Sequence, residues 1–259
     1  MTKTINTHLP NNIHICSSAE LASQKVAQQI AHEILAKQKL GQHIVLGLAT
    51  GNTPKLVYHE LVRMHQNEEL SFKNVISFNL DEYYPMNPEH PLSYHNFMQT
   101  HLFNQVDILP GNIHIPHGSW EKQKLEQHCA EYEEKINQYG GIDVQLLGIG
   151  RNGHIGFNEP GSTLDSRTRL IDLHSTTRKD AAEDFEGLDN VPTQAITMGI
   201  QTIITAKKIL LLALGKRKSE IIKKTLESSV SNEIPATYLQ TRQNIEYILD
   251  EAAASLLNS

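Results

Sequence analysis

The chain has 259 residues, of which 39% are hydrophobic, and a formal net charge of -6 at pH 7. This composition can fill one large core, so we expect residues 1–259 to form a single domain. The acidic balance and the absence of a long basic run argue against a nucleic-acid or membrane-surface binder. The sequence contains neither a membrane-spanning apolar stretch nor the apolar core of a secretory signal, so we expect a cytoplasmic protein.

The chain has two cysteines, Cys16 and Cys129, and neither belongs to a CxxC pair. Such isolated cysteines are typical of unpaired thiols in a reducing compartment. We therefore expect neither a disulfide nor a zinc site.

Strand-like apolar runs alternate with helix-like segments along the chain. For the first helix, Ser17 and Glu20 have capping-box spacing, and Val26, Ile30 and Ile34 recur every four residues. In chain order we expect a helix ending near Leu40, a strand over 44–49, a helix from Pro54, strands over 75–80 and 144–149 with a helix over 120–139 between them, a strand over 209–214, a helix over 216–226, a strand over 245–249 and a final helix from Glu251.

Continuous apolar runs, without alternation, indicate strands that are buried on both faces. The predicted fold class is therefore α/β: a three-layer, mostly parallel open sheet of the Rossmann-like kind, with helices on both faces. Ligands of such sheets bind beyond the carboxyl ends of the strands. The loops that follow the strands are therefore the places to look for function.

The first such loop is Thr50-Gly51-Asn52-Thr53-Pro54, which joins a strand to a helix. Free backbone N–H groups and the positive end of the helix dipole favour an anion there. The GxxxxGK[ST] pattern of a P-loop is absent. On local sequence alone the loop is either a phosphate site or an ordinary capped turn.

The second loop, Phe78 to Pro85, places Asp81 and Glu82 at a strand end beside two tyrosines. A carboxyl group against an apolar wall has a raised pKa, which suits a general base. The alternative is a solvated turn in which Asp81 caps the backbone.

The third loop, Gly148 to Pro160, has four glycines in nine residues and also holds an imidazole, a carboxylate and amides. A histidine in such a bend can exchange protons near neutral pH. The loop contains GxGxxG, but Phe157 to Gly161 does not favour the helix that a dinucleotide site requires.

These three loops, in their order along the chain, resemble the glucosamine-6-phosphate deaminase (isomerase) family. The resemblance covers about residues 14–257 and is carried by the blocks at 46–54, 78–83, 153–160, 166–169, 195–199 and 214–218. Related lactonases, which hydrolyse phosphosugar lactones, share a Gly-His pair but lack the sequence Phe157-Asn158-Glu159-Pro160.

The resemblance implies one catalytic domain that converts glucosamine 6-phosphate to fructose 6-phosphate and ammonia, in amino-sugar catabolism, without metal or organic cofactor. It implies that His154 opens the sugar ring, that Glu159 orients the imidazole and that Asn152 completes this group. Asp81 would take the C2 proton and return a proton at C1. The residues implied to hold the phosphate are Thr50, Gly51, Asn52, Thr53 and Lys218.

The chain departs from the family pattern at several positions. Asn152 stands where some members have Asp, and Glu183 stands where many have a phosphate-binding arginine. We expect Glu183 to point away from the site, and we consider Arg178 as a further phosphate ligand. Some members bind an allosteric activator through a Lys and a Thr, at positions occupied here by Ile171 and Asp172, so we expect no such activation.

Other functions remain open at this stage. The substrate could be an epimer such as galactosamine 6-phosphate, or the chain could be a non-catalytic sugar-phosphate sensor. A sensor has no need for Asp81, His154 and Glu159 together. We expect a small phosphosugar as the partner and leave a homo-oligomer possible.

Overall fold

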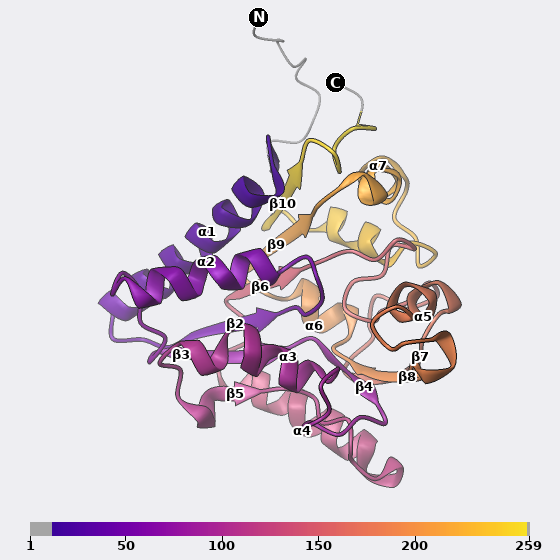
Figure 1. The fold of residues 1–259 in the computed structure, drawn as a ribbon, viewed down its shortest axis with the longest axis horizontal. Helices are drawn as coiled ribbons and strands as arrows, with labels where there is room; N and C mark the ends of the chain where they lie inside the picture. Colours follow the sequence, from indigo (N-terminus) through magenta and orange to yellow (C-terminus); the bar gives the residue numbers. More distant parts are fainter. Residues whose placement is uncertain (1–11, 258–259) are drawn as a thin grey trace, which may run out of the picture.

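A computed structural model describes residues 12–257 of the chain. Within these residues, a seven-stranded parallel sheet has the order β1-β10-β9-β6-β2-β3-β5 (Figure 1). Its strands are β1 (Ile13–Cys16), β2 (Ile44–Leu48), β3 (Val75–Asn79), β5 (Ile113–His114), β6 (Val144–Leu147), β9 (Lys208–Ala213) and β10 (Ile245–Asp250). Every residue of β2, β3 and β6 is buried. This open sheet confirms the predicted α/β fold class.

Helices cover both faces of the sheet. The α-helices are α1 (Ala19–Lys39), α2 (Lys55–Gln66), α3 (Tyr94–His101), α4 (Leu125–Gln138), α5 (Ser175–Ala181), α6 (Ile200–Ile204) and α7 (Ser219–Glu227). The short 3-10 helices are η1 (Phe103–Gln105), η2 (Pro110–Asn112), η3 (Lys122–Lys124), η4 (Leu188–Asn190), η5 (Lys216–Lys218) and η6 (Pro235–Thr241). Crossovers between parallel strands are right-handed. Helices in connections that move along the sheet toward β5 therefore lie on one face, and helices in connections that move back toward β1 lie on the other. Figure 1 shows α1 and α2 side by side on one of these faces.

Most predicted elements are confirmed, with differences at their ends. The cap of α1 is Ser18 rather than Ser17, and its Oγ accepts the Leu21 N–H at 3.2 Å. The helix predicted over 120–139 begins at Leu125 as α4. Both cysteines are free, as expected. No helix among the described residues is long and apolar enough to cross a membrane.

The predicted final helix from Glu251 is wrong, because residues 251–257 form turns. The Asp250 carboxylate accepts the Ala253 N–H at 2.7 Å, which folds the chain back just after β10. The same carboxylate accepts the Gly215 N–H at 2.9 Å, beyond the end of β9. The bond to Ala253 resembles a helix cap, but after the Ala254 N–H bonds the Asp250 carbonyl, Ser255 and Leu257 bond carbonyls three residues back, so the chain makes successive turns and no regular helix.

A second, three-stranded antiparallel sheet was not predicted. Its order is β4-β8-β7, and its strands are β4 (Asp81–Tyr84), β7 (Arg169–Asp172) and β8 (Gln194–Thr197). The chain passes from β3 into β4 at Leu80, which donates its N–H to the Leu48 carbonyl at 3.0 Å and accepts the Met198 N–H at 2.6 Å. Asp81 therefore lies at the junction of the two sheets.

In the sheet, β2 lies between β3 and β6. The chain continues from β2 to β3 on one side, and after β5 it returns to β6 on the other side. Leu48 at the end of β2 is in register with Asn79 at the end of β3. The loops after β2, β3 and β6 therefore emerge side by side at one edge of the sheet. Such a switch point opens the crevice in which ligands of α/β sheets bind.

Candidate active site

A cavity of about 230 Å³ lies beyond this edge of the sheet. The predicted site residues that line it are Thr50, Gly51, Asn52, Thr53, Asp81, His154 and Lys218. The other two, Asn152 and Glu159, lie behind His154 and are bonded to each other. The structure therefore brings all the predicted site residues to one place.

Asp81 is buried, with 5% of its surface exposed. Burial, and then the charge of Glu82, raise the pKa of Asp81 to about 8. The Tyr83 ring lies 4.9 Å from the ring of Tyr94 and 5.3 Å from that of Phe157, measured between centroids, and all three rings line the cavity. No described group gives the Asp81 carboxylate a hydrogen bond. An apolar wall with an unbonded carboxyl group suits a general base.

Glu82 has a different role from its neighbour, because successive residues of a strand point to opposite sides. Its carboxylate accepts the N–H groups of Tyr83 at 2.9 Å and of Tyr94 and His95 at 3.0 Å. It thus binds the N-terminus of α3. Burial raises the pKa of Glu82 to about 7, although these hydrogen bonds act to lower it. Of the two adjacent carboxylates, only Asp81 faces the cavity.

His154 is held from behind. Its Nδ1 lies 3.4 Å from Oε2 of Glu159, and Asn152 donates from Nδ2 to the same oxygen at 2.7 Å. Burial acts to raise the Glu159 pKa, but the hydrogen bonds and charge of His154, with Thr177 and Asn152, lower it to about 2. Glu159 is therefore an anion that orients the imidazole, whose Nε2 remains for proton exchange.

Thr177 also belongs to this group, although sequence reasoning missed it. Its Oγ1 lies 3.2 Å from Nδ1 of His154, and the residue lines the cavity from α5. The backbone N–H of His174, just before this helix, donates to Glu159 at 3.2 Å. No spacing in the sequence indicates a contact between α5 and the Gly-rich loop.

Two glycines let the Gly-rich loop fold onto these groups. A Cβ at Gly150 would overlap the ring of His154, whose carbonyl accepts the Gly150 N–H at 2.9 Å. Gly156 has a φ of 56°, and a Cβ there would lie 3.0 Å from Oγ1 of Thr197 and 3.4 Å from Oδ2 of Asp81. The glycines thus provide close approach to the proposed acid–base groups.

The part of the cavity wall formed by the loop after Thr50 is suited to an anion. Gly51 has a φ of 90°, and within the described residues the N–H groups of positions 51–53 donate to no acceptor. Lys218 lines the same cavity from η5, and its Nζ donates to the Ile149 carbonyl at 2.6 Å. Burial lowers the Lys218 pKa, an effect that the charge of Asp180 opposes. A dianionic phosphate would supply the missing acceptors.

Arg178, considered above as a phosphate ligand, is not part of the cavity wall. Its Nη2 donates to the carbonyls of Leu188 at 2.9 Å and Val191 at 3.1 Å, which directs the guanidinium toward η4. Glu183 is exposed and is also absent from the wall. Among the described residues, Lys218 is the only lysine or arginine that lines the cavity.

The segments around Arg169 and Thr197 hold the Gly-rich loop in place. Asn158 is fully buried, and its Nδ2 donates to the carbonyls of Ile155 at 2.9 Å and Met198 at 2.8 Å. Its Oδ1 accepts from Arg169 at 2.9 Å. Phe157 donates its N–H to Oγ1 of Thr197 at 3.0 Å. Asn158 and Arg169 therefore position the segment that carries Glu159.

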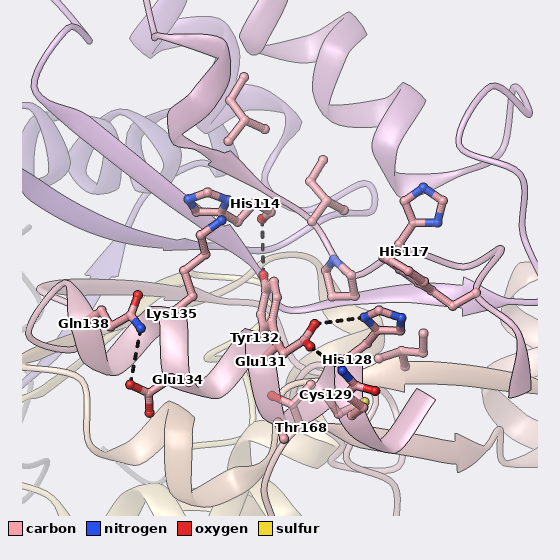
Figure 2. Close-up of a pocket in the computed structure, with 17 residues that line it drawn as sticks. His114, His117, His128, Cys129, Glu131, Tyr132, Glu134, Lys135, Gln138 and Thr168 are labelled. Atoms are coloured by element: carbon pink, nitrogen blue, oxygen red, sulfur yellow. Dashed lines mark hydrogen bonds and ion pairs between the residues drawn. The ribbon is translucent and has the colours of Figure 1, made fainter. Parts of the chain in front are cut away.

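A larger hollow, of about 810 Å³, lies between β5 and α4 (Figure 2). None of the predicted site residues line it. Glu131 accepts from His128 at 3.2 Å, and the Tyr132 hydroxyl donates to the His114 carbonyl at 3.2 Å. No cluster of three or more His, Cys, Asp or Glu side chains that could hold a metal ion occurs among residues 12–257. We therefore take the smaller cavity as the candidate site.

The family described as glucosamine-6-phosphate isomerases/6-phosphogluconolactonase matches residues 17–248. The chain belongs to this family. A glucosamine-6-phosphate deaminase of Oceanobacillus iheyensis is 48% identical over 237 residues, which are 92% of this chain and 91% of the relative. The Bacillus subtilis glucosamine-6-phosphate deaminase 1 is 44% identical over 241 residues, 93% of this chain and 97% of the relative.

A solved structure of a monomeric glucosamine-6-phosphate deaminase superposes with a TM-score of 0.90 at 44% identity, covering 95% of this chain and 99% of that chain. The family also includes lactonases. The 6-phosphogluconolactonase of Trypanosoma brucei has a TM-score of 0.76 at 19% identity, over 96% of this chain and 99% of that chain. This second likeness shows the common fold alone.

Proposed function

We propose that the chain converts glucosamine 6-phosphate and water to fructose 6-phosphate and ammonia, an aldose–ketose isomerisation with deamination. The observation that carries the proposal is a single cavity whose wall brings together Asp81, His154 with Glu159 behind it, and unbonded N–H groups with Lys218. Deaminases that are 44–48% identical support the same activity.

The reaction begins with ring opening. The imidazole of His154, held by the Glu159 anion, moves a proton between the anomeric hydroxyl and the ring oxygen, which frees the aldehyde at C1. A histidine suits both directions of this transfer near neutral pH.

Isomerisation follows at C2. Asp81 takes the C2 proton to give an enolamine, and a proton returned at C1 converts this to an imine at C2. Water adds to the imine carbon and ammonia leaves, which yields the ketone of fructose 6-phosphate. One carboxylate can serve both carbons because they are adjacent.

The phosphate fixes the sugar for these steps. The N–H groups after Thr50 and the ammonium of Lys218 bind it in the same cavity as Asp81. Such anchoring converts proton transfer into a step within one complex, and the positioning contributes much of the rate.

Ammonia release from glucosamine 6-phosphate, measured beside galactosamine 6-phosphate in buffer with EDTA, tests the proposal. We expect turnover of the gluco epimer that EDTA leaves unchanged. Preference for galactosamine 6-phosphate would assign the epimeric enzyme instead. Binding of either sugar phosphate without ammonia release would favour the non-catalytic sensor.

A further inference from the structure

One carboxylate of the cavity wall has no role in the steps above. Asp184 lines the cavity just after α5, and the ring of the next residue, Phe185, lies 5.1 Å from that of Tyr83. Phe185 is buried, so this contact holds Asp184 beside Tyr83. Tyr83 follows Asp81 by two positions in β4, and residues at that spacing share one side of a strand. Asp184 therefore lies on the side of the cavity that Tyr83 lines.

The carboxylates of the wall differ in their partners. Asp180 pairs with Arg151, whose Nε donates to it at 2.9 Å. Asp81 is buried, whereas Asp184 is exposed and makes no hydrogen bond or ion pair with any residue in the described part of the chain. Asp184 is thus the one exposed carboxylate of the wall that lacks a cation.

The charges of these aspartates act on different side chains of the cavity wall. Burial chiefly raises the pKa of Tyr83 to about 12, and the charges of Asp81 and Asp184 add to the effect. The Lys218 ammonium responds instead to Asp180 and Arg151. Asp184 thus acts on Tyr83, whereas Asp180 is the carboxylate that acts on Lys218.

An unpaired carboxylate would repel a phosphate, but it matches the one cationic group of an amino sugar. We propose that Asp184 is a specificity-determining residue that binds the C2 ammonium group of the substrate. The inference rests on the proposed function, since Asp81 is assigned to the C2 proton. A carboxylate–ammonium bond is charge-assisted, and an amine that stays protonated makes the neighbouring C2–H more acidic.

Asp184→Asn tests this role with two ligands that share the phosphate and differ at C2. The KM for glucosamine 6-phosphate should rise about 3- to 10-fold, the range between an exposed ion pair and a charged hydrogen bond. The inhibition constant of fructose 6-phosphate, which has no amine, should stay unchanged or fall. Raising the pH until the amine deprotonates should weaken wild-type affinity more than that of the variant.

Glu183→Gln is the matched control. It removes the same negative charge at the neighbouring position, and the Glu183 side chain does not line the cavity. It should alter neither constant. Tighter binding of both ligands by Asp184→Asn would place Asp184 at the phosphate, and equal weakening or no change for both would also overturn the inference. If the wild type releases no ammonia, the proposed function fails on its own. Calorimetric affinities of the same two ligands for wild type and Asp184→Asn then still decide the role of Asp184.

Discussion

Nδ1 of His154 lies 3.4 Å from Oε2 of Glu159, the same oxygen to which Asn152 donates at 2.7 Å. Asn152 therefore fixes the carboxylate, and the carboxylate fixes the imidazole. With a pKa near 2, Glu159 stays ionised throughout the neutral range. The Glu159 carboxylate therefore stays charged beside the imidazole across that range.

The first prediction follows from this pair. Because Glu159 acts only through His154, His154→Gln and Glu159→Gln should each lower kcat/KM by about 10²–10⁴-fold, and the double variant should lose little more than either single one. Steady-state kinetics of the three variants measure this coupling. Losses that multiply in the double variant would mean that the two residues act separately.

The second prediction concerns Gly150, where an added methyl group would overlap the His154 ring. Gly150→Ala should displace the imidazole from Glu159 and lower kcat by about 10²-fold or more, in the range of lost acid–base catalysis. Circular dichroism should show an intact fold. In a His154→Ala background, where the ring is absent, the same change should cost far less. An equal cost in both backgrounds would show that Gly150 acts through another contact.

The third prediction uses the burial of Asp81. Asp81→Asn keeps the shape of the side chain and removes its basicity, so kcat should fall by about 10²–10⁴-fold while substrate affinity changes little. In the wild type, kcat/KM should rise with pH toward the Asp81 pKa of about 8, as the base form is populated. Near-normal turnover by the purified variant would remove Asp81 from the mechanism.

Asp81→Asn, which should lower activity, should raise the stability of the fold. Between the ordinary aspartate pKa of 3.8 and about 8, the folded state binds the Asp81 proton more tightly than the unfolded state does. Stability contributed by this group therefore falls as pH rises through that window. Asp81→Asn should raise Tm at pH 8 by at least ~2 °C, which corresponds to about 1 kcal/mol in a chain of this size. The gain should shrink toward pH 4, and a lower Tm at pH 8 would contradict it.

The sequence was sufficient to predict the parallel sheet and the three loops at its edge, because continuous apolar runs such as 44–48 mark buried strands. It was insufficient for the second sheet, whose strands are short and partly polar, as in β7. Thr177 and Asp184 were missed for a related reason. Their proximity to His154 and Tyr83 depends on how α5 folds over the cavity, which no local pattern encodes. The different roles of Asp81 and Glu82 were also not predictable, because they depend on which side of β4 each side chain faces.

The last prediction concerns the proposed phosphate site, because Lys218 is the one lysine or arginine in the cavity wall among residues 12–257. A hydrogen bond to a charged group contributes about 1.5–3 kcal/mol, so Lys218→Ala should raise the KM for glucosamine 6-phosphate by roughly one to two powers of ten. The substitution also removes the donor to the Ile149 carbonyl, which lies 2.6 Å from Nζ, so a structural effect must be distinguished from a lost phosphate contact. Glucosamine without phosphate makes that distinction, because its weak turnover should be unaffected if Lys218 acts on phosphate alone. A parallel loss with both sugars would assign Lys218 to the loop at Ile149, and an unaltered KM would leave phosphate binding to the N–H groups after Thr50.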